Sequence, residues 1–424
     1  MKLSIISQVT LFLLPIFVFS QNSFKDHEMK WMKGWTNFDP NHEVYPEAEE
    51  TLPTIIDSDI FLSNDITYLM SGNVYVTKNA LLTIEEGTII RCDSEKSTSL
   101  VITKGAKLIA QGSKTQPIVF TSNKSAKGRK AGDWGGIVIV GTGTINSPTG
   151  TGIIEGNFAP QYSIFGGDKD DDITTIMTYV RIEYAGQKIN RSKELNGLTL
   201  YALGKLSVIN NIMISHSADD SFECFGGNVK MNNLISYKAK DDDYDFTLGY
   251  KGGMKNIVAI RHPYISDSSG SYAIEIDGYD KNTGFISESS LSKVKIENAV
   301  FINLADRTNY QHTTAAIAAK NMAQLDLTNS QISGFANVIK FDKSFQSFAD
   351  ISKSFTLDNS VFNVHDKSVL VSYDEPYSTT KKLLQYNMFT TYFKSAKDLF
   401  TDPMNIKHPK FTLKESLGNY TVMQ

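Results

Sequence analysis

The chain has 424 residues but only two cysteines, no cluster of basic residues and no long apolar run after its first 20 residues. Its formal net charge is −4, so nothing in it indicates a nucleic-acid partner. Without a later apolar run of about 20 residues, no transmembrane helix is expected in the rest of the chain. The chain also lacks a Gly/Ser-rich or proline-rich linker, which favours one elongated domain over several globular ones.

Residues 1–20 have the pattern of a secretory signal peptide. Lys2 gives a short basic start, an apolar run extends from Leu11 to Phe19, and the small residue Ser20 precedes a polar stretch. The run is too short for a stable membrane span, and no cysteine follows it closely enough to carry a lipid anchor. We therefore expect an exported protein that resides in the periplasm, at the cell surface or in the medium.

Short runs rich in β-branched residues recur along the chain, separated by Gly, Asn, Asp and Ser. Because Asn tolerates the left-handed conformation of a tight corner and its amide can bond to the next turn, regularly spaced Asn residues mark the corners of a solenoid. The regular spacing of these Asn residues and strand-like runs predicts an all-β fold, a single-stranded parallel β-helix. The Asn residues recur at about 22 and later about 30 residues, at Asn211, Asn233, Asn256, Asn298, Asn329 and Asn359.

Cys92 and Cys224 are expected to be reduced and buried in such a solenoid. With about 22 residues per turn they lie about six turns apart, which is roughly 30 Å along the axis. A disulfide needs Cα atoms within about 7 Å of each other. An intermolecular disulfide is the alternative in an exported protein.

Five motifs carry a resemblance to a known family: Leu82-Thr-Ile-Glu-Glu-Gly87, Gly105-Ala-Lys-Leu-Ile-Ala-Gln-Gly112, Gly132-Asp-Trp-Gly-Gly136, Tyr179-Val-Arg-Ile-Glu-Tyr-Ala-Gly186 and Asp219-Asp-Ser-Phe-Glu-Cys-Phe-Gly-Gly227. Together they resemble exported bacterial proteins of the pectin-lyase-like superfamily. The similarity covers roughly residues 60–280 and extends to a group in Bacteroidota that mostly has no assigned activity. It implies a right-handed parallel β-helix, and it implies little about function because many activities share this fold.

The expected domain boundaries follow from these patterns. After the signal peptide at 1–20, residues 21–55, with Trp31, Trp35 and Phe38, are expected to form an N-terminal tail and cap. Residues 56–365 are expected to form the β-helix, and residues 366–424 a C-terminal capping segment. Capping is expected because an open sheet edge at either end of a β-helix invites aggregation. The alternative for the last segment is an irregular tail.

Two stretches about 22 residues apart, at 216–225 and 237–246, carry nearly the same acidic pattern. Stacked turns would place their carboxylates about 5 Å apart, where repulsion is roughly 3–4 kcal/mol per pair at an effective dielectric near 20. A bound cation would relieve this repulsion, and calcium suits a cluster of hard oxygen ligands in loose geometry. The expected ligands are seven carboxylates, namely Asp219, Asp220, Glu223, Asp241, Asp242, Asp243 and Asp245.

The alternative is a set of carboxylates that are solvated or that form turns. Asp is a common corner residue, and Asp219 and Asp220 would point to opposite faces of an extended strand. Zinc is not expected, since no histidine-rich or cysteine-rich cluster accompanies the acidic residues. A second acidic run, at 168–172, is interpreted as a solvated loop.

The resemblance also implies a catalytic alternative. Some polysaccharide lyases of this fold bind calcium through stacked acidic residues, and a nearby basic residue removes the proton next to a uronate carboxylate. The candidates for that base are His216, Lys238 and Arg261, which fall in one column if the Asn corners set the register. The Gly-His-Gly and Arg-Ile-Lys elements expected of a polygalacturonase are missing, as are the basic motifs of the well-known pectate lyases.

The leading hypothesis is a non-catalytic, exported β-helix protein of the cell envelope or surface that binds a glycan, another ligand or a protein partner. Tyr237, Tyr244 and Tyr250 lie on or near the acidic turns and are suited to stack on sugar rings. Alternatively, they pack as ordinary rungs of the β-helix. The other hypotheses are a calcium-dependent polysaccharide lyase or related carbohydrate-active enzyme, and a structural accessory subunit of an outer-membrane complex.

Overall fold

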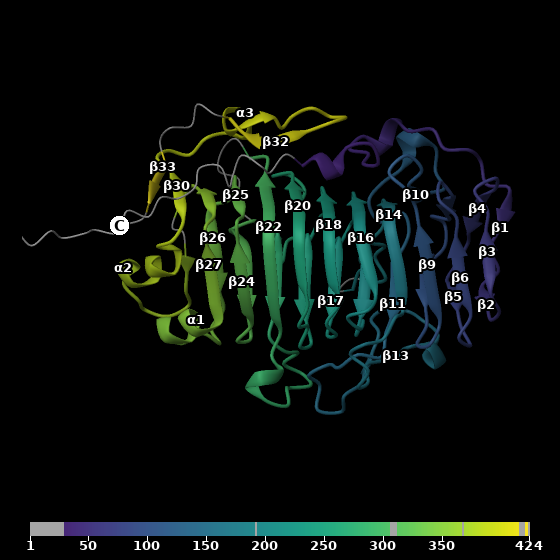
Figure 1. Cartoon of the computed structure of the whole chain (residues 1–424), viewed down its shortest axis with the longest axis horizontal. Coiled ribbons are helices and arrows are strands. Elements are labelled where there is room, and N and C mark those ends of the chain that lie inside the picture. Colours follow the sequence, from purple (N-terminus) through teal and green to yellow (C-terminus); the bar gives the residue numbers. More distant parts are fainter. Residues whose placement is uncertain (1–28, 191–192, 306–311, 367–368, 415–419, 423–424) are drawn as a thin grey trace, which may run out of the picture.

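The computed structural model describes residues 29–190, 193–305, 312–366, 369–414 and 420–422. The predicted signal peptide at 1–20 and the start of the predicted tail at 21–28 lie outside these residues. The described strands stack side by side along the long axis of the molecule and belong mainly to two long sheets (Figure 1). Nearly all of their pairings are parallel, so the chain forms the predicted all-β parallel β-helix.

The first sheet contains the longest strands of the solenoid. Its strands are β1 (Glu50–Thr51), β3 (Ile60–Leu62), β4 (Thr67–Met70), β6 (Leu81–Ile84), β7 (Ile89–Cys92), β9 (Lys107–Gln111), β10 (Ile118–Ser122), β14 (Thr175–Glu183), β16 (Val208–Ser215), β18 (Lys230–Tyr237), β20 (Gly253–Arg261), β22 (Lys293–Asn303), β24 (Gln324–Thr328), β25 (Gln331–Ser333), β27 (Phe355–Asp358), β28 (Val361–Asn363), β30 (Met388–Thr390) and β33 (Tyr420–Val422).

The second sheet contains one short strand from each turn. Its strands are β2 (Ile55–Ile56), β5 (Val74–Val76), β8 (Leu100–Ile102), β11 (Ile137–Val140), β15 (Leu198–Tyr201), β17 (Phe222–Phe225), β19 (Tyr244–Thr247), β21 (Ile274–Asp277), β23 (Ala315–Lys320), β26 (Asn337–Phe341) and β29 (Val369–Leu370). Outside the two sheets lie the hairpins β12 (Gly152–Ile153) with β13 (Ile164–Phe165) and β31 (Phe400–Asp402) with β32 (Lys410–Leu413), and the helices α1 (Phe348–Ser354), α2 (Tyr377–Thr380) and α3 (Ala396–Leu399).

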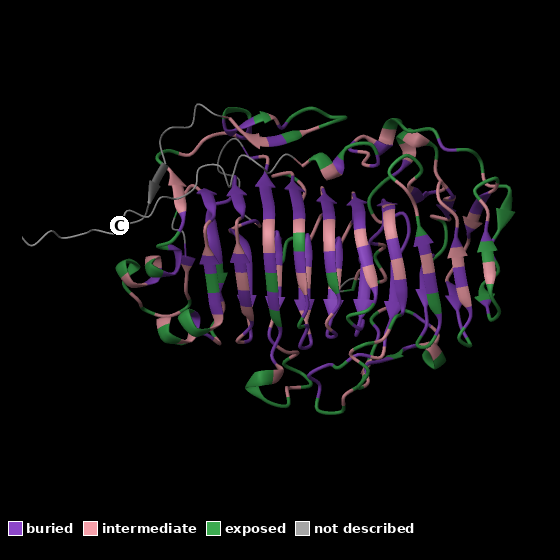
Figure 2. Cartoon of the chain, viewed as in Figure 1, coloured by how far each residue is buried: buried purple, intermediate pink, exposed green. Residues whose placement is uncertain are grey.

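Apolar side chains at matching positions of successive turns fill the interior of the solenoid. Ile212 pairs with Leu234 and Leu234 with Ile257, and all three are fully buried. On the other side of the core, the rings of Phe222 and Tyr244 stack with centroids 5.2 Å apart. Residues next to these positions point outwards because consecutive side chains of a strand alternate between the two faces. Buried residues therefore run along the strands, and exposed ones gather in the loops and at the ends (Figure 2).

The Asn residues form the predicted column of corners. Asn211, Asn233 and Asn256 have φ angles of 58°, 57° and 57°, and each bends the long strand that contains it. Nδ2 of Asn233 donates to Oδ1 of Asn211 at 3.4 Å, and Nδ2 of Asn256 donates to Oδ1 of Asn233 at 3.0 Å. Asn298 continues the ladder to Asn256 at 3.1 Å. These bonds hold the turns in register, so that side chains one turn apart lie opposite each other.

Residues 29–45, which we call the strap, lie along a side wall of the solenoid. Trp35 packs edge-on against Tyr179, with ring centroids 5.7 Å apart, and Phe38 packs in the same way against Tyr237 at 5.2 Å. The α3–β32 segment covers the neighbouring part of this wall (Figure 1). The aromatic residues of the predicted N-terminal cap therefore cover outward-facing side chains of β16, β18 and β20, whereas β1 and β2 lie at the first turn of the stack.

At the other end, β30 pairs with β28 and continues the first sheet, and Leu383 and Leu384 pack into the end of the core. Cys92 and Cys224 are buried and unpaired, as predicted. In the described part of the chain, no helix is long and apolar enough to cross a membrane.

Candidate metal centre

Most of the acidic residues lie in the connections that lead from the first sheet to the second in two successive turns, and Glu223 and Asp245 lie in the strands β17 and β19 that follow. One connection runs from β16 to β17 and the next from β18 to β19. Glu223 pairs with Asp245, and the main-chain amide of Asp242 donates to Oδ1 of Asp220 at 2.8 Å. This register places Asp219 and Asp220 opposite Asp241 and Asp242. The two turns therefore bring their carboxylates to one place.

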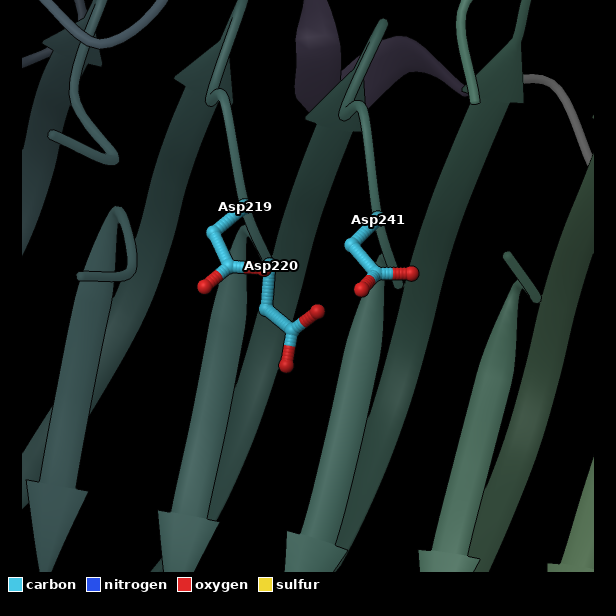
Figure 3. Close-up of side chains that lie close together, drawn as sticks. All are labelled: Asp219, Asp220 and Asp241. Carbon is cyan, nitrogen blue, oxygen red and sulfur yellow. The ribbon is translucent and has the colours of Figure 1, made fainter. Parts of the chain in front are cut away.

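Two groups of three carboxylates are close enough to share a cation. In each group, one oxygen from every residue lies within 4.8 Å of the others. The first group is Asp219, Asp220 and Asp241 (Figure 3), and the second is Asp220, Asp242 and Asp245. Asp220 belongs to both, so a pair of cations would share its carboxylate.

The bent backbone of the connection explains why neighbouring aspartates reach the same group. An extended strand would point Asp219 and Asp220 to opposite faces, which is the arrangement that favours solvated carboxylates. Residues 216–220 instead form a bend before β17 begins. Both side chains therefore turn toward Asp241 of the next turn (Figure 3).

Asp243 does not belong to the cluster, although the sequence groups it there. Its position in the register is opposite Ser221, and its side chain points into the solenoid. Oδ2 accepts from Nη1 of Arg261 at 2.8 Å, and the other oxygen accepts from the hydroxyl of Ser236. Asp243 and Arg261 are both fully buried. The expected metal ligand is instead one half of an internal ion pair.

A third turn adds groups that the sequence did not suggest. Glu275 in β21 pairs with Asp245, and its carboxylate accepts from Nζ of Lys320 in β23. The intervening loop at 262–273 breaks the 22-residue spacing and hides this turn. One sequence signal could have revealed the third turn: the apolar and acidic residues alternate in Ile274-Glu275-Ile276-Asp277 as they do in Phe222-Glu223-Cys224. Glu275 and Lys320 line a cleft of about 290 Å³ together with the acidic cluster and with Glu155, Glu194 and Asn196.

Burial and mutual repulsion raise the pKa of the clustered carboxyl groups. Burial, followed by the charge of Asp241, raises the pKa of Asp219 to about 8. Burial and Glu275 raise the pKa of Asp241 to about 7. The pKa values of Asp220 and Asp242 are also well above the ordinary value because both groups are buried among other carboxylates. Without a cation, the cluster therefore holds protons at neutral pH.

Among the described residues, lysines lie at the two ends of the cleft, and Lys340 also lines it. At one end, Lys240 lies 3.0 Å from Asp267 and 3.7 Å from Glu194. At the other, Lys320 pairs with Glu275. Among the residues that the structure describes, none forms an ion pair with the carboxylates of the first group. Oδ1 of Asp241 and Oδ1 of Asp245 are buried and accept no hydrogen bond within the described structure.

The three candidate bases occupy one column, as the Asn register predicts, but none of them lines the cleft. His216 packs between the rings of Tyr184 and Tyr237, at centroid distances of 5.3 Å and 5.6 Å. Burial and the charge of Lys238 lower the pKa of His216 to about 4, so it is neutral at physiological pH. Lys238 lies over the ring of Tyr237, on the side of the strap.

None of the three tyrosines that the sequence suggests for ligand binding lines the acidic cleft. Tyr244 and Tyr250 are fully buried in the core, where their hydroxyl groups donate to main-chain carbonyls of Val258 and Val229. Tyr237 is covered by Phe38 of the strap. The assignment of Tyr244 and Tyr250 to a ligand surface is therefore corrected. Tyr244 alternates inward with Asp245 in β19. Tyr250 follows this strand in a turn, and its ring stacks on that of Phe246 in the core.

Comparison with known protein families assigns most of the chain to one family. Residues 54–398 match the pectate-lyase like beta helix domain. No curated protein and no solved structure gives a significant match. The family match extends beyond the 56–365 range expected for the β-helix, and the parallel stacking of β2 to β29 agrees with it. The chain belongs to the family of pectate-lyase-like β-helix domains.

Proposed function

We propose that the protein is an exported, non-catalytic binding protein of the cell envelope whose acidic cleft holds a divalent cation. The observation that carries the proposal is the central group Asp219, Asp220 and Asp241, whose oxygens converge without a positive side chain among them. Buried charges without partners are strongly unfavourable, and a cation supplies the missing partner. Export rests on the signal-peptide pattern of residues 1–20.

Calcium fits the donor set best. It takes six to eight oxygen ligands in variable geometry, and the cleft is lined mainly by carboxylates. The two groups contain only aspartates, without the sulfur or imidazole ligands that favour zinc. Two linked groups that share Asp220 also suit calcium, because one carboxylate can bridge two ions.

The basic groups near the cleft support binding rather than proton abstraction. Burial lowers the pKa of Lys320, but the ion pair with Glu275 and the charges of Asp245 and Asp277 together raise it above the ordinary value. For Lys240, burial lowers the pKa, and Asp267 and Glu194 together raise it above the ordinary value. A base must be deprotonated near the working pH, and these two lysines remain charged there. Arg261 is buried in its ion pair with Asp243, away from any substrate.

A calcium titration followed by thermal unfolding tests the proposal. Millimolar calcium should raise the melting temperature of the mature protein above its value in chelator. At a calcium concentration of 100 times Kd, the free energy of unfolding should increase by about 2.7 kcal/mol. The variants Asp219→Asn and Asp242→Asn should lose most of this response. Asp171→Asn, an exposed residue of the acidic run at 168–172, serves as the matched control and should keep it.

Two outcomes would overturn the proposal. The cation site is wrong if the melting temperature of the unmodified protein is the same in calcium and in chelator. The non-catalytic assignment is wrong if the protein releases unsaturated, ultraviolet-absorbing products from uronate polymers in calcium. Co-purification with outer-membrane proteins would favour the role of an accessory subunit over glycan binding.

A further inference from the structure

A second cavity of about 550 Å³ continues the acidic cleft along the outer face of the second sheet. The two share Glu155, Glu223, Asp245 and Lys320 as lining residues. The β12–β13 hairpin provides one wall of the second cavity, and the loop that begins at Tyr279 provides the opposite wall. We call the two cavities together the groove. Its volume is in the range of sites that bind small molecules or short oligomers.

The second cavity contains a buried polar group without a partner. Asn321 is 4% exposed, and its Nδ2 donates to Oδ1 of Asp277 at 2.6 Å and to the main-chain oxygen of Tyr279. Its Oδ1 is buried and accepts no hydrogen bond within the described structure. A buried acceptor without a donor is costly, and a ligand that donates a hydrogen bond would satisfy it.

The walls of the cavity also present apolar surface. Ile153 on the hairpin is 75% exposed, and Tyr279, whose ring packs against that of Phe285, lines the opposite side. Leu248 and Phe225 form apolar parts of the floor. A slot with one aromatic wall and hydrogen-bond acceptors beside it suits the CH faces and hydroxyl groups of a sugar ring.

The charge of the groove restricts which sugars it accepts. Eleven carboxylates and three lysines line the two cavities, which gives a formal charge of −8 when every carboxyl group is ionised. Two divalent cations at the acidic cleft would still leave −4. The field of such a groove repels anionic polymers and attracts cationic ones, and the lining groups are mainly hydrogen-bond acceptors.

We propose that the groove binds an oligosaccharide of neutral or amino sugars and rejects uronate polymers. This inference rests on the proposed binding function and names the ligand class of the same site. Amino and hydroxyl groups donate to Oδ1 of Asn321 and to the carboxylates, and the apolar sugar faces lie against Tyr279 and Ile153. A carboxylate on each sugar would add repulsion, and the two lysines that line the second cavity are already paired, Lys320 with Glu275 and Lys281 with Asp342.

Three β-1,4-linked pentamers with the same backbone separate these possibilities: the glucose, glucosamine and glucuronate oligomers. Isothermal titration with each, in calcium and in chelator, should show binding of the first two. The glucuronate pentamer should bind at least about tenfold more weakly because it carries like charge. Binding of the glucosamine pentamer should weaken with added salt, whereas binding of the glucose pentamer should not.

Tyr279→Ala should weaken binding of the accepted pentamer about fivefold by removing the aromatic wall. Tyr264→Ala is the control, because this tyrosine is 78% exposed and lines neither cavity. Equal or tighter binding of the glucuronate pentamer, in calcium or in chelator, would overturn the inference. So would the absence of binding to both other pentamers, or equal losses in the two tyrosine variants.

The calcium response separates this inference from the proposed function. A protein that is stabilised by calcium but binds none of the pentamers retains its cation site and loses only the sugar assignment. A protein that binds the glucose pentamer but shows no stabilisation by calcium retains the sugar assignment and loses only the cation site. Tyr279→Ala should leave the calcium response unchanged, since Tyr279 lies in neither group of cation ligands.

Discussion

Arg261 and Asp243 form an ion pair behind the acidic cleft, with Nη1 and Oδ2 separated by 2.8 Å and both side chains almost wholly buried. The guanidinium also donates to the main-chain oxygen of Tyr272, which lies in the same turn as Arg261 and one turn after Asp243. The pair thus links the wall of the cleft to the solenoid interior. Removing one partner of such a pair leaves a buried charge alone.

Arg261→Met should lower the free energy of unfolding by about 3–5 kcal/mol, because Asp243 would remain buried without its cation. The double variant Arg261→Met with Asp243→Leu should recover much of this loss, since no unpaired charge remains. Lys238→Met, at the equivalent position one turn earlier, should cost about 1 kcal/mol or less. Denaturant unfolding measures all three, and similar losses for Arg261→Met and Lys238→Met would contradict the role of the pair.

The raised pKa values predict that the cation-free protein becomes less stable as the pH increases. The pKa values of Asp219 and Asp241 are about 8 and about 7 in the folded protein, against an ordinary value of 3.8. Between the ordinary and the folded pKa, the native state binds more protons than the unfolded state, so its stability falls as the pH rises. In chelator, the melting temperature should therefore decline from about pH 5 to about pH 8.

Saturating calcium should reduce or abolish this decline, because the ion stabilises the ionised carboxylates. The calcium affinity should rise over the same pH range, since protons compete with the ion. The variant Asp219→Asn should show a flatter profile in chelator than the unmodified protein. A melting temperature in chelator that rises steadily with pH would show that these carboxyl groups are not protonated in the fold.

The Asn ladder gives a prediction about stability that does not depend on the cleft. Asn256 has a φ angle of 57°, and its amide bonds to Asn233 and Asn298 in the neighbouring turns. Asn256→Gly keeps the left-handed backbone and loses the ladder bonds, which should cost about 1 kcal/mol. Asn256→Val should cost about 1–2 kcal/mol more, because a β-branched residue is strained at positive φ. Equal stability of the two variants would show that the backbone conformation is unimportant there.

The period of the sequence was sufficient to predict the stack and the register of the first two acidic turns. Asn211, Asn233 and Asn256 carry that information locally, because only a few residues tolerate the corner conformation. The bend that turns both Asp219 and Asp220 toward Asp241 was not predictable from side-chain alternation. The third turn with Glu275 was missed because the loop at 262–273 changes the spacing.

The position of the strap depends on contacts between distant residues, which a local pattern does not specify. One signal was nevertheless present in the long strands. Met213, Ile235 and Val258 alternate with inward-facing residues and are themselves apolar and buried. A strand that is apolar on both faces needs a cover on its outer side. The pattern therefore indicated a covered wall, although not that residues 29–45 provide the cover.

The strap is anchored to the wall by a hydrogen bond that can be tested directly. The hydroxyl of Tyr45 lies 2.9 Å and 3.1 Å from the two carboxylate oxygens of Glu183, which is 1% exposed. Tyr45→Phe removes this donor, so the free energy of unfolding at neutral pH should fall by about 1.5–3 kcal/mol. The loss should shrink at acidic pH, because burial already raises the pKa of Glu183 and a protonated carboxyl needs the donor less.

Limited proteolysis under native conditions provides the second measurement. Cleavage within residues 29–45 should be faster in Tyr45→Phe than in the unmodified protein, because weaker anchoring increases the population in which the strap is detached. Tyr264→Phe, which alters an exposed tyrosine, is the control and should change neither the stability nor the cleavage rate. If Tyr45→Phe loses stability equally at neutral and acidic pH, the lost interaction is packing of the ring and not the bond to an ionised Glu183.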